Sequence, residues 1–271
     1  MSNEEGSPKE IMNSEKSNVP DNLSNRDIEK KTTSQGITKA SLGAMPRVSA
    51  WSGALGFPFF FVILTIAGLI TPGYSPVSEH GSDLSVLKYA WLFNYALTVY
   101  GISLIIFSVG FYRAISPIFT RRRSIAVNIL LVLSAVGGIL AGVFTVAPGQ
   151  LYIHAFGGLL IFGLPPLAQI IAGSKLRFVS GSKKYGTYTF VSGIVNLAID
   201  IFGTFYPILK FVPSMLPIVN ALNYQLTGLY QRIEMIVTWG WFPVTGVRSL
   251  TLRGTENIIH SPKNDKNKQS N

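Results

Sequence analysis

The chain alternates between long uncharged apolar runs and short polar connections. A helix needs about 20 apolar residues to cross the hydrocarbon core of a bilayer, and several of these runs reach that length. The fourth run contains Pro165-Pro166, which predicts a kink, and the sixth holds Arg232 and Glu234 near its start. We therefore predict an all-α bundle of six transmembrane helices, at about residues 51–71, 89–111, 125–146, 153–172, 188–209 and 226–247.

Polar segments flank this predicted membrane domain of residues 50–250. Residues 1–46 are rich in Ser, Asn, Lys and Glu and hold too few apolar side chains to offset the entropy of ordering, so we expect a disordered tail. It does not resemble a secretory signal, because its first thirty residues lack an apolar core. Residues 254–271 form a second predicted polar tail.

Composition excludes several classes of protein. Only 13% of the 271 residues are charged, about half the share of an ordinary soluble domain. The absence of cysteine removes disulfide frameworks, thiolate nucleophiles, cysteine zinc sites and iron–sulfur clusters. The net charge of +10 does not indicate nucleic-acid binding, because the basic residues lie in the tails and in short connections between apolar runs.

The distribution of Lys and Arg predicts the orientation. Twenty of the 23 lie in the two tails and in the second and fourth connections, and only Lys88, Lys210 and Arg232 lie on the other side. Because cytoplasmic connections carry the excess of positive charge, we expect a multi-pass protein of the cell membrane with both termini in the cytoplasm.

Every Asp and Glu of the membrane domain, with two of the three histidines, falls in its predicted outer half, where such residues outline a candidate polar pocket. Its members are Glu79, His80, Asp83, His154, Asp200 and Arg232. Asp200 is the most informative, because a carboxylate facing lipid costs roughly 2.5–3.5 kcal/mol and such groups usually face the bundle interior.

Asp200 shares one helix face with Ser192, Asn196 and Thr204, since these residues recur every four positions. This stripe indicates either a polar pocket or ion path, or a structural carboxylate. In the structural case, Asp200 would pair with Arg232 or bond to Asn94 and Thr98.

The cluster of Glu79, His80, Asp83 and His154 leaves three interpretations open. Its side chains could hold a divalent cation or act as acid and base, or Glu79 and Asp83 could cap the entry to the second predicted span. No paired-histidine zinc motif, nucleophile elbow or phosphate loop is present, so we predict no catalytic residue, cofactor or resident metal. Gly138 and Gly142 predict a close contact between helices.

Four stretches make the chain resemble the bacterial and archaeal membrane family called domain of unknown function 998. They are Gly73-Tyr-Ser-Pro-Val-Ser-Glu-His with Ser82-Asp-Leu, Ala90-Trp-Leu-Phe-Asn, Gly142-Val-Phe-Thr-Val-Ala-Pro with His154, and Gly228-Leu-Tyr-Gln-Arg with Trp239. The resemblance implies the fold and the location, and no activity. Gln231 departs from the family, which usually has an acidic residue there.

We expect a non-enzymatic membrane protein whose outer-facing pocket binds or passes a small polar ligand, an ion or a lipid headgroup. In this pocket Asp200 and Arg232 would form a buried charge pair. Two alternatives remain: a lipid hydrolase or transferase that uses the His and carboxylate cluster, and an assembly partner that contacts another membrane protein through Gly138 and Gly142. The expected partner is the lipid bilayer, and the sequence identifies no protein partner.

Overall fold

A computed structural model describes residues 43–209 and 225–259, without the side chains of 202–209 and 253–259. Contacts divide the chain into residues 1–39 and residues 40–271, and every described helix belongs to the second unit. Most of the predicted N-terminal tail therefore lies outside the described residues, and so does the predicted C-terminal tail beyond residue 259. Residues 254–259, predicted as the start of that tail, instead continue the last helix.

The described residues form helices and no strands, which confirms the predicted all-α class for this part of the chain. Four of the helices, α2 to α5, are long and apolar enough to cross a membrane. The elements are α2 (Arg47–Ile70), the short 3₁₀ helix η1 (Gly81–Val86), α3 (Ala90–Ile115), α4 (Arg121–Val143), α5 (Leu151–Leu176), α6 (Lys183–Leu209), α8 (Thr227–Trp239) and α9 (Trp241–Ile259).

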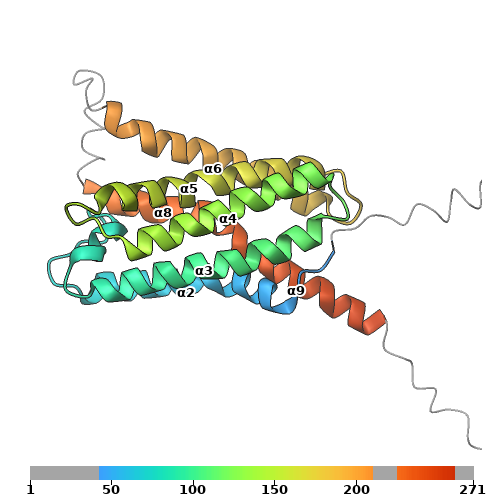
Figure 1. Cartoon of the computed structure of the whole chain (residues 1–271), viewed down its shortest axis with the longest axis horizontal. Helices are drawn as coiled ribbons and strands as arrows, with labels where there is room; N and C mark the ends of the chain where they lie inside the picture. Colours follow the sequence, from blue (N-terminus) through green and yellow to red (C-terminus); the bar gives the residue numbers. More distant parts are fainter. Residues whose placement is uncertain (1–42, 210–224, 260–271) are drawn as a thin grey trace, which may run out of the picture. The chain divides into compact units, whose positions relative to one another are not determined.

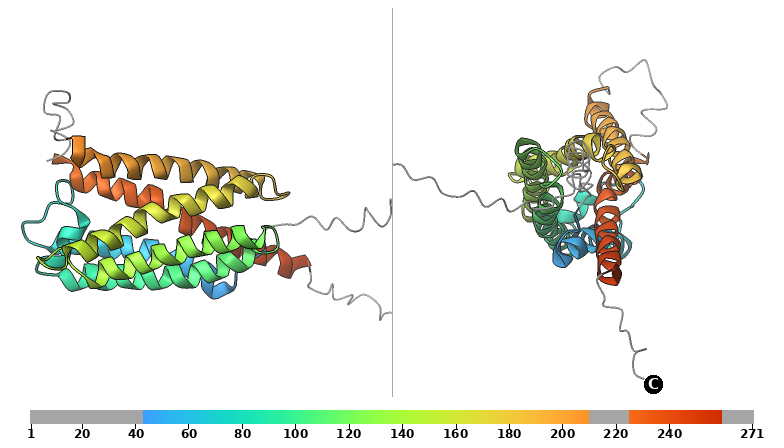
Figure 2. Two further views of the ribbon diagram at one scale, coloured as in Figure 1. Left: turned by 45° about the horizontal axis from the view of Figure 1, so that its top comes forward. Right: turned by 90° about the vertical axis from the view of Figure 1, so that its right-hand side faces the viewer.

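Helices that follow one another in sequence lie side by side, so α2 to α6 form a series of antiparallel hairpins (Figure 1). The series closes because α9 packs on α2 and α8 contacts both α5 and α6 (Figure 2). The bundle thus has two ends. We call the end with residues 71–89 and 144–150 the acidic end, and the end with residues 116–120 and 177–182 the basic end.

The predicted sixth span, residues 226–247, is not one helix. It is divided at Gly240, where α8 ends and α9 begins. Pro243 explains the break, because it has no N–H to donate to the carbonyl of Trp239 and its ring disfavours a continuous helix. A neighbouring helix compensates: the Gln169 side chain donates from Nε2 to the carbonyl of Thr238 (3.3 Å). Such support makes a broken helix acceptable inside an apolar bundle.

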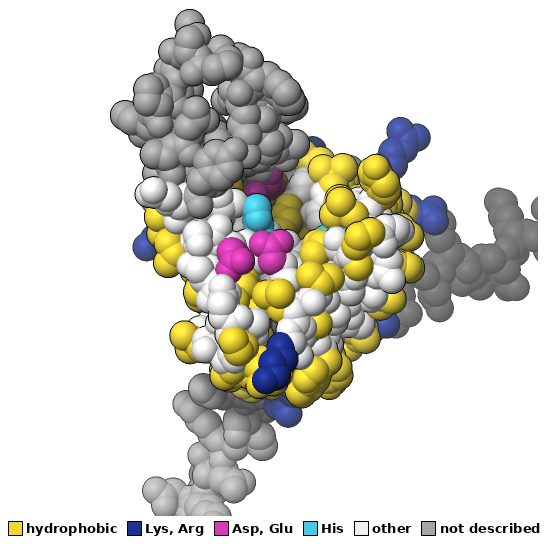
Figure 3. All heavy atoms as spheres, turned by 90° about the vertical axis from the view of Figure 1, so that its left-hand side faces the viewer, with side chains coloured by type: hydrophobic (Ala, Val, Ile, Leu, Met, Phe, Trp, Pro, Cys, Tyr) yellow, Lys and Arg dark blue, Asp and Glu magenta, His cyan; other side chains and the backbone are white. Residues whose placement is uncertain are grey.

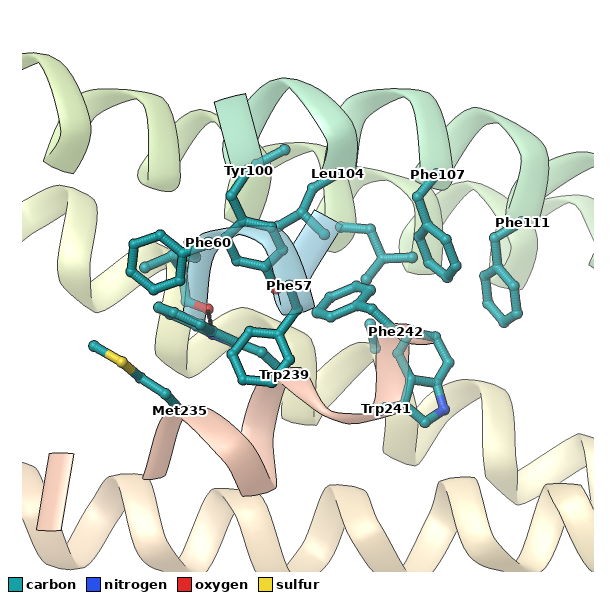
Figure 4. Close-up of a cluster of buried hydrophobic side chains, with 14 of the residues drawn as sticks. Phe57, Phe60, Tyr100, Leu104, Phe107, Phe111, Met235, Trp239, Trp241 and Phe242 are labelled. Carbon is teal, nitrogen blue, oxygen red and sulfur yellow. Dashed lines mark hydrogen bonds between the residues drawn. The ribbon is translucent and has the colours of Figure 1, made fainter. Parts of the chain in front are cut away.

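Aromatic side chains from α2, α3, α8 and α9 meet where α8 turns into α9 (Figure 4). Trp239 contacts the rings of Phe60, Tyr100 and Phe162, with centroid distances of 5.7, 5.2 and 4.6 Å. Its indole N–H donates to the carbonyl of Ile161 (3.1 Å), so the polar atom of this buried side chain is satisfied. This packing fixes the position of the break, and with it the position of α8.

Gly138 and Gly142 lie inside the bundle, in contact with helices of the same chain. A Cβ atom at Gly142 would overlap Thr98 of α3, and one at Gly138 would lie 2.8 Å from Ile161 Cδ1 of α5. The predicted close helix contact is therefore present, and it is internal. The hypothesis that these glycines bind another membrane protein is wrong in this respect, because α3 and α5 already occupy that surface.

Candidate functional site

The loop after α2 is held against the start of α8 by a dense set of contacts. Leu229 donates its backbone N–H to the carbonyl of Val77 (2.9 Å), and Gly81 donates to Gln231 Oε1 (2.6 Å). Gly228 allows this approach, because a Cβ there would overlap the carbonyl oxygen of Glu79. Two stretches that are 150 residues apart in sequence therefore form one unit at the acidic end.

Arg232 is the main side-chain link in this unit. Its guanidinium donates to the Tyr74 hydroxyl (2.7 Å) and to the carbonyls of Gly228 (2.9 Å) and Glu79 (3.4 Å). Tyr74 in turn donates to the carbonyl of His80 (3.0 Å). Burial raises the pKa of Tyr74, while the neighbouring Arg232 opposes that rise. Arg232 therefore holds the loop rather than a ligand.

The acidic and histidine side chains of the loop serve mainly to shape it. Figure 3 shows these groups gathered on the acidic end. Asp83 accepts a hydrogen bond from the backbone N–H of His80 (2.9 Å), and Glu79 accepts one from the backbone N–H of Ser75. Asp83 therefore caps the start of η1 at Gly81, whereas the prediction places this cap at the entry to the second span, which begins as α3 at Ala90. The His80 and Asp83 side chains are about half exposed and lie 3.9 Å apart.

His154 does not join the other predicted pocket residues. It is buried, and its Nδ1 lies 2.8 Å from the carbonyl oxygen of Phe144, the residue that ends α4. The imidazole therefore ties the first turns of α5 to the end of α4. In the part of the chain that the structure describes, no three His, Asp or Glu side chains are grouped as metal ligands.

A second polar cluster lies deeper, between α5, α6 and α8, and we call it the buried polar cluster. Gln169 of α5 is at its centre and is fully buried. Gln169 Oε1 accepts hydrogen bonds from Ser192 Oγ (2.8 Å) and Asn196 Nδ2 (2.9 Å), both on α6. The predicted polar stripe of α6 thus faces the bundle interior at these two positions. The side chain of Thr204, the last predicted member, lies outside the described residues.

Asp200 completes the stripe, but its partners differ from those predicted. It is 7% exposed and accepts a long hydrogen bond from Thr238 Oγ1 of α8 (3.5 Å). The carboxyl group of Glu234, one helical turn from Thr238, lies within hydrogen-bonding reach of Asp200. The predicted pair with Arg232 is not formed, because Arg232 is bound to the loop.

The predicted alternative of bonds to Asn94 and Thr98 is not formed either. Asn94 donates to the carbonyl of Ser85 (3.4 Å), and Thr98 donates to the carbonyl of Asn94 (2.8 Å). Both residues lie on α3, whereas α6 packs against α5 and α8. Asp200 is therefore held by α8, on the other side of the bundle from these residues.

The buried polar cluster has more acceptors than donors. Asn196 Oδ1 and Asp200 Oδ2 are both buried without a hydrogen-bond donor. Among the side chains that the structure describes, the one ion pair within 4 Å joins His80 and Asp83, so no basic side chain neutralises Asp200 or Glu234. An ionised carboxylate only accepts hydrogen bonds, and two neighbouring carboxylates repel each other. The cluster is therefore electrostatically suited to a small cation.

Glu234 and Gln169 are members of this cluster that the prediction places neither in the pocket nor on the polar stripe of Asp200. Glu234 was placed near Arg232 at the start of the sixth span, and its spacing of four residues from Thr238 was the available signal of a shared face. Gln169 is an isolated amide in an otherwise apolar helix, three residues after Pro166. An isolated polar residue of this kind inside a membrane helix indicates an interhelical hydrogen bond.

These features, four helices long and apolar enough to cross a membrane and a buried polar cluster between helices, are consistent with an integral membrane protein. More particularly, the chain belongs to the family described as protein of unknown function (DUF998), whose model matches residues 54–248. All four stretches that carry the resemblance lie in this range, and contacts at the acidic end join them. Tyr74 of the first contacts Arg232 of the fourth, and Asn94 of the second and Val146 of the third both contact Ser85 of η1. No curated protein and no solved structure matches the chain.

Proposed function

We propose that this protein is a non-enzymatic membrane protein that binds a small cation, a proton or an alkali-metal ion, at Asp200 and Glu234. The observation that carries the proposal is this pair of carboxyl groups. Asp200 is buried and Glu234 is partly buried, and the pair lacks a basic partner among the described side chains. Buried charges inside membrane helices are expensive, and they commonly mark ion or proton pathways. A broken helix beside the site is a further feature shared with transporters.

The proposal refines the predicted outer pocket. Asp200 is retained as a binding residue, and Glu234 replaces Arg232 as its partner. The loop residues Glu79, His80 and Asp83 would lie above the site at the acidic end, where the cation enters. His154 and Arg232 would support the surrounding helices and loop.

We further propose six spans, with α8 and α9 together forming the sixth, and both termini in the cytoplasm. The support is the placement of charge, since Arg121, Arg122 and Arg123 start α4 at the basic end while Lys88 lies at the acidic end. The chain has no cysteine, so single cysteines report directly on sidedness. In whole cells, a membrane-impermeant maleimide should label Ser82→Cys and spare Ser116→Cys, and the reverse pattern would refute this orientation.

The test of cation binding is thermal unfolding of purified protein in LiCl, NaCl or KCl against N-methyl-D-glucamine chloride of equal ionic strength, at several pH values. A cation that binds only the folded state raises stability by about 2.7 kcal/mol at a concentration one hundred times its Kd. We expect one cation, or acidification, to stabilise the wild type. Asp200→Asn and Glu234→Gln should lose this response.

Matched controls are available at the acidic end. Asp83→Asn and Glu79→Gln make the same chemical changes in loop carboxylates, where the amide oxygen can still accept the backbone hydrogen bond. Both controls should keep the wild-type response. If all five proteins respond alike, or if the wild type shows no response, the proposed binding site is wrong.

A further inference from the structure

The hydrogen bonds of Gln169 determine the orientation of Asn196. Gln169 donates from Nε2 to the carbonyl of Thr238, and its Oε1 accepts from Ser192 and Asn196. Because Asn196 uses its Nδ2 in this contact, its Oδ1 is the atom left for another partner. That oxygen is buried and has no donor.

Asp200 lies one helical turn beyond Asn196 on the same face of α6, toward the acidic end. Its Oδ1 accepts from Thr238, whereas its Oδ2 is buried without a donor. Two acceptors without donors therefore lie on the same face, one turn apart. A proton on Asp200 Oδ2 would convert that oxygen into a donor and provide Asn196 Oδ1 with a partner.

The charged and titratable groups on the elements packed around Asp200 have partners of their own, apart from Glu234. On α8, Tyr230 donates to the carbonyl of Ile199 (2.8 Å), and Arg232 is bound to the loop. On α5, His154 contacts the carbonyl of Phe144. On α6 itself, Tyr188 lies three turns away. Glu234 is thus the ionisable side chain that these contacts leave to interact with Asp200.

Building on the proposed function, we propose that the bound cation is a proton shared by Asp200 and Glu234, and that Gln169 and Asn196 are positioning residues for it. One proton enters from water at the acidic end and converts the pair of carboxylates into one carboxylic acid and one carboxylate. When the proton rests on Asp200 Oδ2, this O–H group donates a hydrogen bond to Asn196 Oδ1. On release, the proton returns to water and the pair is again doubly ionised.

The number of ligands favours a proton over a divalent metal ion. A hard cation such as Mg²⁺ or Ca²⁺ takes six or more oxygen ligands. The described side chains around Asp200 provide two carboxyl groups, one amide oxygen and one hydroxyl group. A proton needs one donor and one acceptor oxygen, which this set supplies.

The experiment is pH-dependent difference infrared spectroscopy of the full-length protein in lipid, without added metal. We expect a carbonyl band of a protonated carboxyl group that titrates in the wild type and is lost in Asp200→Asn and Glu234→Gln. Asn196→Val removes the proposed acceptor, so the band should shift in frequency. Its midpoint should move to lower pH by about one unit, a tenfold weaker proton affinity. Gln169→Met should act in the same direction.

The control is Asn128→Val, because Asn128 of α4 also has a buried Oδ1 without a donor but lies on a helix that does not carry the site. It should leave both the frequency and the midpoint unchanged. If Asn196→Val does not yield folded protein, Asn196→Ser takes its place, since a serine side chain is too short to accept from the next turn.

The possible results separate the two proposals. If the band is the same in the Asn196 and Gln169 variants as in the wild type, the positioning roles of these two residues are overturned. A second result would be stabilisation by sodium or potassium that Asp200→Asn removes, without a titrating carboxyl band. This result would support the proposed cation site and overturn the proposal that the cation is a proton. No titrating band and no cation response would overturn both.

Discussion

The hydrogen bond between Arg232 and Tyr74 should stabilise the fold by connecting the loop after α2 to α8. Tyr74→Phe removes one hydrogen bond from a charged donor (2.7 Å) and one to the carbonyl of His80 (3.0 Å). A hydrogen bond to a charged group contributes about 1.5–3 kcal/mol and a neutral one about 1 kcal/mol. Allowing for partial access of water to the loop, we expect Tyr74→Phe to lower the free energy of unfolding by about 2–3 kcal/mol.

A double-mutant cycle isolates this contact from the other bonds of the two residues. Arg232→Met also loses its bonds to Gly228 and Glu79, so it should cost at least as much as Tyr74→Phe. Both single variants lose the same bond, so their separate losses of unfolding free energy count it twice. The double variant should therefore lose about 1–2 kcal/mol less than the sum of the two single losses. The measurement is equilibrium unfolding in mixed micelles.

The control cycle uses Tyr95 instead of Tyr74. Tyr95 lies on α3 and is 60% exposed. Tyr95→Phe and Arg232→Met should be additive within about 0.5 kcal/mol, as expected for residues without a shared contact. If Tyr74→Phe and Arg232→Met are also additive, the bond at 2.7 Å contributes nothing to stability. The view that Arg232 holds the loop would then be refuted.

Two further predictions concern the same unit. Burial raises the folded-state pKa of Tyr74, so its contribution is fully present below the ordinary tyrosine pKa of about 10 and is lost as pH rises through the folded value. The stability difference between wild type and Tyr74→Phe should therefore shrink in pH-dependent unfolding above about pH 10, and a constant difference would contradict this. Gly228→Ala should cost about 1–3 kcal/mol in the same assay, because the new Cβ overlaps the carbonyl of Glu79. Gly158→Ala, where a Cβ meets nothing within 4 Å, should not destabilise, and an equal loss would show that the effect is not steric.

Much of the fold could be predicted because apolar runs of helix length are a local property. The predicted spans at 51–71 and 89–111 correspond to α2 and α3 with small shifts at their ends. The division of the span at 226–247 was missed, although Gly240 and Pro243 are both visible in the sequence. Membrane helices often tolerate Gly and Pro, so these residues alone do not show whether a helix kinks or stops.

The candidate site was predicted in part. Asp200 and its polar stripe were found because a carboxylate in an apolar run is conspicuous and helical spacing is regular. Its partner was assigned wrongly, because opposite charge favours Arg232 when helix rotation is unknown. Arg232 and Glu234 are two residues apart, so they point to different sides of α8, and only Glu234 faces α6.

The sequence by itself determined the class of protein, the length and number of its apolar runs, and the family, because hydropathy and short motifs are read along one chain. The tertiary structure decided which polar groups meet. Gln169 and Asp200 contact Thr238 of α8, and Asn196 contacts Gln169, only because α5, α6 and α8 pack with a particular rotation. Trp239 sets the position of the break among aromatic rings from α2, α3 and α5. Helix rotation and depth depend on contacts between side chains far apart in sequence, so no local pattern specifies them.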